Sequence, residues 1–197
     1  MSYARNLDLI HIHIPKCGGT SIVHALMKVD PTVHHGHQPI SHFPMRRTVP
    51  SFAVIRHPCD RFISTWKFFR SRDNFWVKKH GLPPAFGLIS SMSLSNAAKS
   101  LEENQHVLDQ WPFPSHVFNE VWFRQHAFVQ ADDMRVGNLF PFERMDLVWD
   151  WLASYGAKEV HLNAGYPSPH WSKMLDRMTV QRIERIYEKD FELYFRA

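Results

Sequence analysis

The feature that most constrains the fold is segment 10–22, which reads IHIHIPKCGGTSI. It begins with an apolar run of strand length that is rich in β-branched residues, and Pro15 ends this run. Gly18 and Gly19 then allow a tight turn and a close approach of the backbone to a ligand. The segment therefore predicts a buried strand followed by a glycine-bearing loop.

A helix is expected directly after this loop. Its N-cap is predicted to be Thr20 or Ser21, and apolar residues recur at helical spacing as far as Met27. The first N–H groups of a helix lack backbone acceptors and carry partial positive charge, and Lys16 adds a full charge at the edge of the loop. Together these groups predict a cradle for a phosphate-like anion. The alternative is a plain strand–helix turn with a solvated lysine.

The order of residues in the loop separates it from an ordinary nucleotide P-loop. In the GxxxxGK[ST] motif the lysine follows the last glycine, whereas Lys16 precedes both glycines. The PKxGGTS order resembles the 5′-phosphosulfate-binding loop of sulfotransferases, which use 3′-phosphoadenosine 5′-phosphosulfate (PAPS) as sulfuryl donor. This resemblance implies that the donor is bound by Lys16, Cys17, Gly18, Gly19, Thr20 and Ser21.

A second buried strand is expected at Ser51–Ile55, followed by RHPCDRFISTW at positions 56–66. Pro58 suits the first turn of a helix that would carry Ser64. Arginine can clamp a phosphate with two parallel hydrogen bonds, and a serine hydroxyl can add another. The R-x-P-x-x-R-x-x-S spacing resembles the 3′-phosphate-binding motif of sulfotransferases, which implies that Arg56 and Ser64 hold that phosphate. The alternative for Arg56 is a partner in a surface ion pair.

A third informative stretch is HHGH at positions 34–37. In an extended chain His35 and His37 point the same way, and Gly36 leaves room for a substrate. Imidazole titrates near neutral pH, so it can take a proton from an attacking hydroxyl. HGH resembles the segment that supplies the base in uronyl 2-O-sulfotransferases, which implies that His35 or His37 is catalytic. A metal-binding H-x-H pair and solvated loop histidines are the alternatives.

Length and composition bound the class of protein. The 197 residues are expected to form a single domain, residues 1–197, and an apolar content of 44% predicts a globular one. A formal charge of +4 suits an anionic ligand but is too small to require nucleic acid. Two cysteines make no disulfide framework, and no signal peptide or run of about 20 apolar residues is seen. A cytoplasmic enzyme without a membrane span is therefore expected.

Alternating strand and helix patterns predict an α/β fold. Further strands are expected at His126–Val129 and Asn138–Phe142, with Phe142 in the core, and helices at Ser93–Leu108, Met145–Tyr155 and Thr179–Tyr194. Strands separated by helices favour a central, mostly parallel sheet flanked by helices, with ligands at the carboxyl ends of the strands. The family resemblance implies the same architecture, a P-loop-like three-layer fold.

The combined prediction is an enzyme that moves a sulfuryl group from PAPS to an acceptor hydroxyl and releases adenosine 3′,5′-bisphosphate (PAP), without a metal. Lys16 and the loop would neutralise charge on the leaving phosphate. The resemblance of HGH implies a carbohydrate acceptor, and a small alcohol or a lipid is the alternative. A basic, aromatic belt would suit an anionic or sugar-rich acceptor, or would be a solvated helix face: Arg46, Arg47, Lys67, Arg70, Arg72, Lys78 and Lys79. Two other classes stay open, a nucleotide-binding phosphotransferase of the kinase type and a non-enzymatic adenylate-binding module.

Overall fold

The chain divides into two compact units. The computed structural model describes residues 3–34, 36–43, 48–70, 91–105, 108, 121–131, 134–162 and 169–197. The first unit comprises Met1–His57, Gln125–Pro167 and Leu193–Ala197, and the second comprises Pro58–Arg124 and Ser168–Glu192. The first contains a central sheet, whereas the described part of the second is helical.

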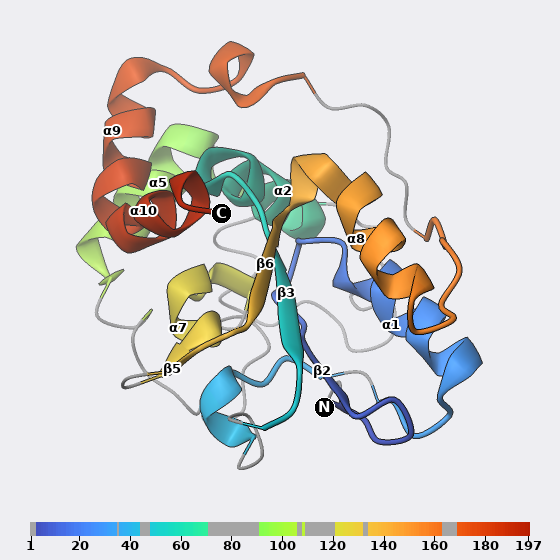
Figure 1. Cartoon of the computed structure of the whole chain (residues 1–197). Coiled ribbons are helices and arrows are strands. Elements are labelled where there is room, and N and C mark those ends of the chain that lie inside the picture. Colours follow the sequence, from blue (N-terminus) through green and yellow to red (C-terminus); the bar gives the residue numbers. More distant parts are fainter. Residues whose placement is uncertain are drawn as a thin grey trace. The chain divides into compact units, whose positions relative to one another are not determined.

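Four strands of the first unit form one sheet, in the order β1 (Tyr3–Ala4), β2 (Leu9–Ile12), β3 (Ser51–Ile55) and β6 (Asn138–Pro141) (Figure 1). β2, β3 and β6 are parallel, and β1 pairs antiparallel with β2. All residues of β2 and β3 are buried, as expected for parallel strands covered on both faces. The predicted α/β class with a mostly parallel sheet is confirmed.

Helices of the first unit lie on both sides of this sheet. In Figure 1, α1 (Gly19–Val29) and α8 (Met145–Ala153) lie on one side of the strands, and α7 (Gln125–Val129) lies on the other. The shorter elements of this unit are η1 (Ile40–His42), β4 (Gln130–Ala131), β5 (Met134–Arg135) and η3 (Phe142–Arg144). This helix–sheet–helix order is that of the predicted three-layer fold.

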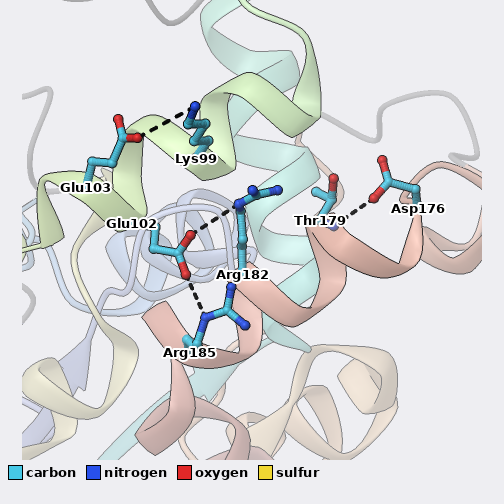
Figure 2. Close-up of polar contacts among 7 residues, drawn as sticks. All are labelled: Lys99, Glu102, Glu103, Asp176, Thr179, Arg182 and Arg185. Atoms are coloured by element: carbon cyan, nitrogen blue, oxygen red, sulfur yellow. Dashed lines mark hydrogen bonds and ion pairs between the residues drawn. The ribbon is translucent and has the colours of Figure 1, made fainter.

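The second unit packs its helices around an apolar cluster. Its elements are α2 (Pro58–Arg70), α5 (Leu94–Glu103), η4 (Trp171–Lys173), α9 (Arg177–Ile186) and α10 (Glu188–Phe195), the last belonging to this unit as far as Glu192. Phe62, Phe69, Trp122, Ile183 and Ile186 are among the buried residues of the cluster. Asp176 caps α9 by accepting a hydrogen bond from the Thr179 N–H at 2.7 Å (Figure 2).

The helix after the glycine loop begins earlier than predicted. Its N-cap is Gly18, which makes no side-chain hydrogen bond, so the prediction of Thr20 or Ser21 is wrong. Gly18 adopts a φ of +77°, a left-handed conformation that costs glycine little and that turns the chain into the helix at Gly19. A preference for capping side chains could not reveal a cap made by backbone conformation alone.

Two further local predictions are wrong. Segment 126–129 is not a strand but part of α7, where Gln125, Phe128 and Val129 are buried at helical spacing. The final helix is two helices, because Tyr187 lies between α9 and α10 in a non-helical conformation. The Tyr187 hydroxyl donates to the Trp122 carbonyl at 2.8 Å, a tertiary contact that helical periodicity does not reveal. None of the described helices has the length and apolar character needed to cross a membrane.

Candidate functional site

Segments that follow three neighbouring parallel strands meet at one edge of the sheet. Arg56 directly follows β3, and its Nη1 donates a hydrogen bond to the carbonyl oxygen of Lys16, in the loop after β2, at 3.3 Å. Phe142 directly follows β6, and its ring centre lies 4.5 Å from the guanidinium carbon of Arg56. Phe142 also packs beside Gly18, since a Cβ there would lie 3.1 Å from the ring. This is the edge at which open α/β sheets bind ligands.

The loop between β2 and α1 is tightly constrained. Lys16 and Gly18, on either side of Cys17, have φ values of +68° and +77°. A left-handed conformation costs a residue with a Cβ about 1–2 kcal/mol, and such strain concentrates at functional sites. At Gly19 a Cβ would overlap the imidazole of His13, so this position admits no side chain unless His13 moves.

The start of α1 offers backbone donors. Because the helix begins at Gly19, the N–H groups of its first turn lack the usual acceptor four residues earlier. Ser21 is already engaged: its N–H donates to the Gly18 carbonyl at 3.1 Å, and its hydroxyl donates to the Leu162 carbonyl at 3.1 Å. The N–H groups of Gly18, Gly19 and Thr20 are therefore the donors of this turn that helix geometry leaves for an anion.

Gln125 contacts the site residues, and the sequence analysis assigned it no role there. Its side chain is fully buried, and Oε1 accepts from the Arg56 N–H at 2.9 Å while Nε2 donates to the Arg56 carbonyl at 2.8 Å. The thiol of Cys17 also donates to Oε1, at 3.4 Å. The available signal was an amide side chain at the start of α7, on the same helical face as the apolar residues Phe128 and Val129.

Of the two predicted histidines, His37 can be placed, whereas His35 lies outside the described residues. The Nδ1 atom of His37 lies 3.1 Å from the His13 carbonyl oxygen, and the two imidazole rings are 4.2 Å apart. A carbonyl can only accept, so Nδ1 carries the proton and the lone pair of the neutral ring is on Nε2. The His13 ring in turn borders Gly19, which brings His37 to the vicinity of the loop.

His11 and His13 are packed histidines. Both are buried, their rings stack with centres 5.7 Å apart, and His11 stacks on Phe52 at 4.7 Å. Phe142, predicted to be a core residue, is only half-buried because it borders Arg56 and Gly18.

Ser64 and part of the basic belt lie in the second unit. Ser64 is half-buried on α2, and its partnership with Arg56 stays a prediction. Arg70 stacks on the Trp66 ring at 4.6 Å and donates to the Met92 carbonyl at 3.4 Å. The belt residues outside the described ranges are Arg46, Arg47, Arg72, Lys78 and Lys79. In the described ranges, no three His, Cys, Asp or Glu side chains gather as metal ligands would.

Comparison with known proteins gives one match. A model described as the sulfotransferase family matches residues 1–195, which include every strand-end residue described above. No curated protein and no solved structure matches the chain significantly.

Proposed function

The chain belongs to the sulfotransferase family, and from this premise we propose that it moves the sulfuryl group of PAPS to a hydroxyl of a carbohydrate acceptor. The observation that carries the proposal is the contact between Arg56 and the loop of Lys16 at the carboxyl ends of adjacent strands. One nucleotide with anionic groups at both ends can bind two such cationic segments. Because the family match spans both units, we propose that they act as one sulfotransferase domain.

The residues present suit PAPS as donor. The 5′-phosphosulfate end would meet Lys16 and the backbone N–H groups of Gly18, Gly19 and Thr20, with Cys17 and Ser21 holding the loop in shape. The 3′-phosphate would meet Arg56, whose Nε is buried without a hydrogen-bond partner among the described residues. A buried donor of this kind calls for an acceptor, which a phosphate oxygen would provide. Ser64 is proposed as a second ligand of this phosphate on its motif alone.

The chemistry follows from the positions of the charged groups. PAPS would supply the sulfuryl group. Nε2 of His37 would take the proton of the acceptor hydroxyl as its oxygen bonds to sulfur, while the sulfur–oxygen bond to the 5′-phosphate breaks. Lys16 and the N–H groups of the loop would stabilise the negative charge that develops on that phosphate oxygen, and PAP would then leave. In this scheme Lys16 does the work that Mg²⁺ does in kinases.

The carbohydrate acceptor is proposed from the HGH segment. The second unit adds a surface of suitable chemistry, because Arg70 stacks on the half-buried ring of Trp66, and arginine pairs with the carboxylate and sulfate groups of acidic sugars.

Calorimetry tests the donor. PAP, 5′-AMP and ATP are titrated into the protein without metal, and ATP again with Mg²⁺. We expect PAP to bind at least about tenfold more tightly than 5′-AMP, because a charge-assisted hydrogen bond contributes about 1.5–3 kcal/mol. Preference for ATP with Mg²⁺ would instead identify a phosphotransferase. Tight PAP binding without transfer from radiolabelled PAPS to any of a panel of glycans and small alcohols would identify a binding module.

A further inference from the structure

The amide of Gln125 bonds to both anion-binding segments at once. Three of its hydrogen bonds are with the Arg56 N–H, the Arg56 carbonyl and the Cys17 thiol. We propose that Gln125 is a positioning residue that holds Arg56 and the Lys16 loop in the mutual arrangement that one nucleotide requires. This inference rests on the proposed function, because the nucleotide is PAP or PAPS.

The first part of the argument concerns Arg56. The pairing of β3 with β6 ends at Ile55, opposite Pro141. One residue further, the Gln125 side chain accepts from the Arg56 N–H and donates to its carbonyl, as the backbone of a neighbouring strand would. These two groups flank the φ and ψ angles of Arg56. Fixing both groups therefore fixes the direction in which the arginine side chain leaves the backbone.

The second part concerns the loop. Oε1 of Gln125 also accepts from the Cys17 thiol at 3.4 Å, a shorter contact than the 3.7 Å between this thiol and the Pro15 carbonyl. Cys17 is adjacent to Lys16, whose carbonyl accepts from Arg56. The contacts form a closed ring through Gln125, Arg56, Lys16 and Cys17. A displacement of either segment would break at least one of these hydrogen bonds.

An amide is not needed to fill this space. Gln125 is 0% exposed, and an apolar side chain of similar volume would fill the space but would leave the Arg56 N–H and carbonyl without these partners. The amide is tolerated because it is hydrogen-bonded, and three of its hydrogen bonds go to the anion-binding segments. This distribution points to positioning of the site in addition to core packing.

The test uses Gln125→Met, which keeps the volume and removes the amide. Gln125→Glu, which keeps the acceptor oxygen and loses the donor, is a second variant should the first fail to fold. Gln130→Met is the matched control, because Gln130 is exposed on β4. The measured quantity is the ratio of the dissociation constants of 5′-AMP and PAP. This ratio reports selectivity for the 3′-phosphate, and a loss of folded protein lowers binding of both nucleotides alike.

We expect the ratio to fall about tenfold or more in Gln125→Met and to stay unchanged in Gln130→Met. In an Arg56→Ala background, Gln125→Met should lower the ratio no further, because Gln125 acts through Arg56. An unchanged ratio in both Gln125→Met and Gln125→Glu would overturn the inference. So would a fall of the ratio in the Arg56→Ala background as large as the fall that Gln125→Met causes in the wild-type protein.

A measurement without nucleotide separates this inference from the proposed donor. Iodoacetamide labelling, followed by peptide mass spectrometry, gives the alkylation rates of Cys17 and of buried Cys59 in the same sample. Cys59 is the internal control, because burial raises the pKa of its thiol to about 12. Gln125→Met should expose Cys17 selectively. If the wild-type protein does not prefer PAP, the donor proposal fails. Selective labelling of Cys17 in Gln125→Met would still support the role of Gln125 in holding the loop. Equal labelling of Cys17 and Cys59 in this variant would overturn that role.

Discussion

The side chain of Arg56 donates a hydrogen bond to the backbone oxygen of Lys16, at 3.3 Å, although the two residues are 40 positions apart in the chain. Lys16 lies in the loop after β2, and Arg56 directly follows β3. Because these strands are parallel and adjacent, both segments leave the sheet at the same edge. Two cationic residues on opposite sides of the molecule could not bind one nucleotide. The contact between Arg56 and the Lys16 backbone is the observation on which the proposed PAPS site rests.

Two substitutions of Lys16 should distinguish the effect of its charge on the transfer rate from the effect of its left-handed backbone on stability. We expect Lys16→Ala and Lys16→Gly to lower the sulfuryl transfer rate on the order of 10²-fold, as removal of one charge-stabilising donor does. Because Lys16 has a φ of +68°, the glycine variant should be at least as stable as the alanine variant in urea unfolding. Near-full transfer by either variant would contradict the role of the charge.

Replacing His37 should affect the chemical step more than donor binding. His37→Ala is expected to lower kcat by about 10²–10⁴-fold and to leave PAP affinity nearly unchanged, because the imidazole acts on the acceptor. His34→Ala is the control, since His34 is exposed and lies outside the HGH segment. A base must be neutral to act, so wild-type kcat should rise with pH, and this rise should be absent in His37→Ala. Its persistence would point to another base.

A methyl group at Gly19 should be tolerated only after His13 is made smaller. Gly19→Ala would push its Cβ into the His13 imidazole, and overpacking of this kind costs about 1–3 kcal/mol. In a His13→Ala background the same substitution should cost much less. Urea unfolding of the four proteins measures this coupling. Additive effects would show that the two positions do not meet.

Glu102 should stabilise the second unit more than its neighbour Glu103 does. Figure 2 shows Glu102 of α5 between Arg182 and Arg185 of α9. The Nε–Oε distances are 3.1 and 2.6 Å, and the Glu102 side chain is only 25% exposed. The Lys99–Glu103 pair is longer, at 3.9 Å, and about 60% exposed on both sides. We expect Glu102→Ala to cost about 1–2 kcal/mol and Glu103→Ala less than about 0.5 kcal/mol.

The difference in stability cost between Glu102→Ala and Glu103→Ala should disappear in acid. The hydrogen bond from Arg185, together with the charges of Arg185 and Arg182, holds the pKa of the Glu102 carboxyl below its ordinary value. The stabilisation by the two Glu102 ion pairs is therefore complete above the unfolded-state pKa of about 4.3. It is lost as the pH falls through the lower folded-state pKa. Urea unfolding of both variants at neutral pH and at about pH 2 measures the change. A cost of Glu102→Ala that is independent of pH would rule out the ion pairs as its cause.

The sequence alone determined the parts of the protein that depend on local pattern. Segments of strand length that are rich in β-branched residues, bounded by Pro15 and by Arg56, predicted β2 and β3. Two glycines between a strand and an amphipathic helix predicted the constrained loop, and an arginine directly after a buried strand predicted the second cation at the same edge.

Only the tertiary structure decided which side chains meet there. Gln125 and Phe142 lie more than 60 residues from Arg56 in the chain, so no local periodicity relates them to it. Gly19 is required because the ring of His13 occupies its side-chain position, and the helix starts at Gly19 because its N-cap, Gly18, takes a left-handed conformation. Local pattern specifies where backbone dihedrals change, whereas the neighbours of each side chain depend on strand order and on long-range packing, which single segments do not encode.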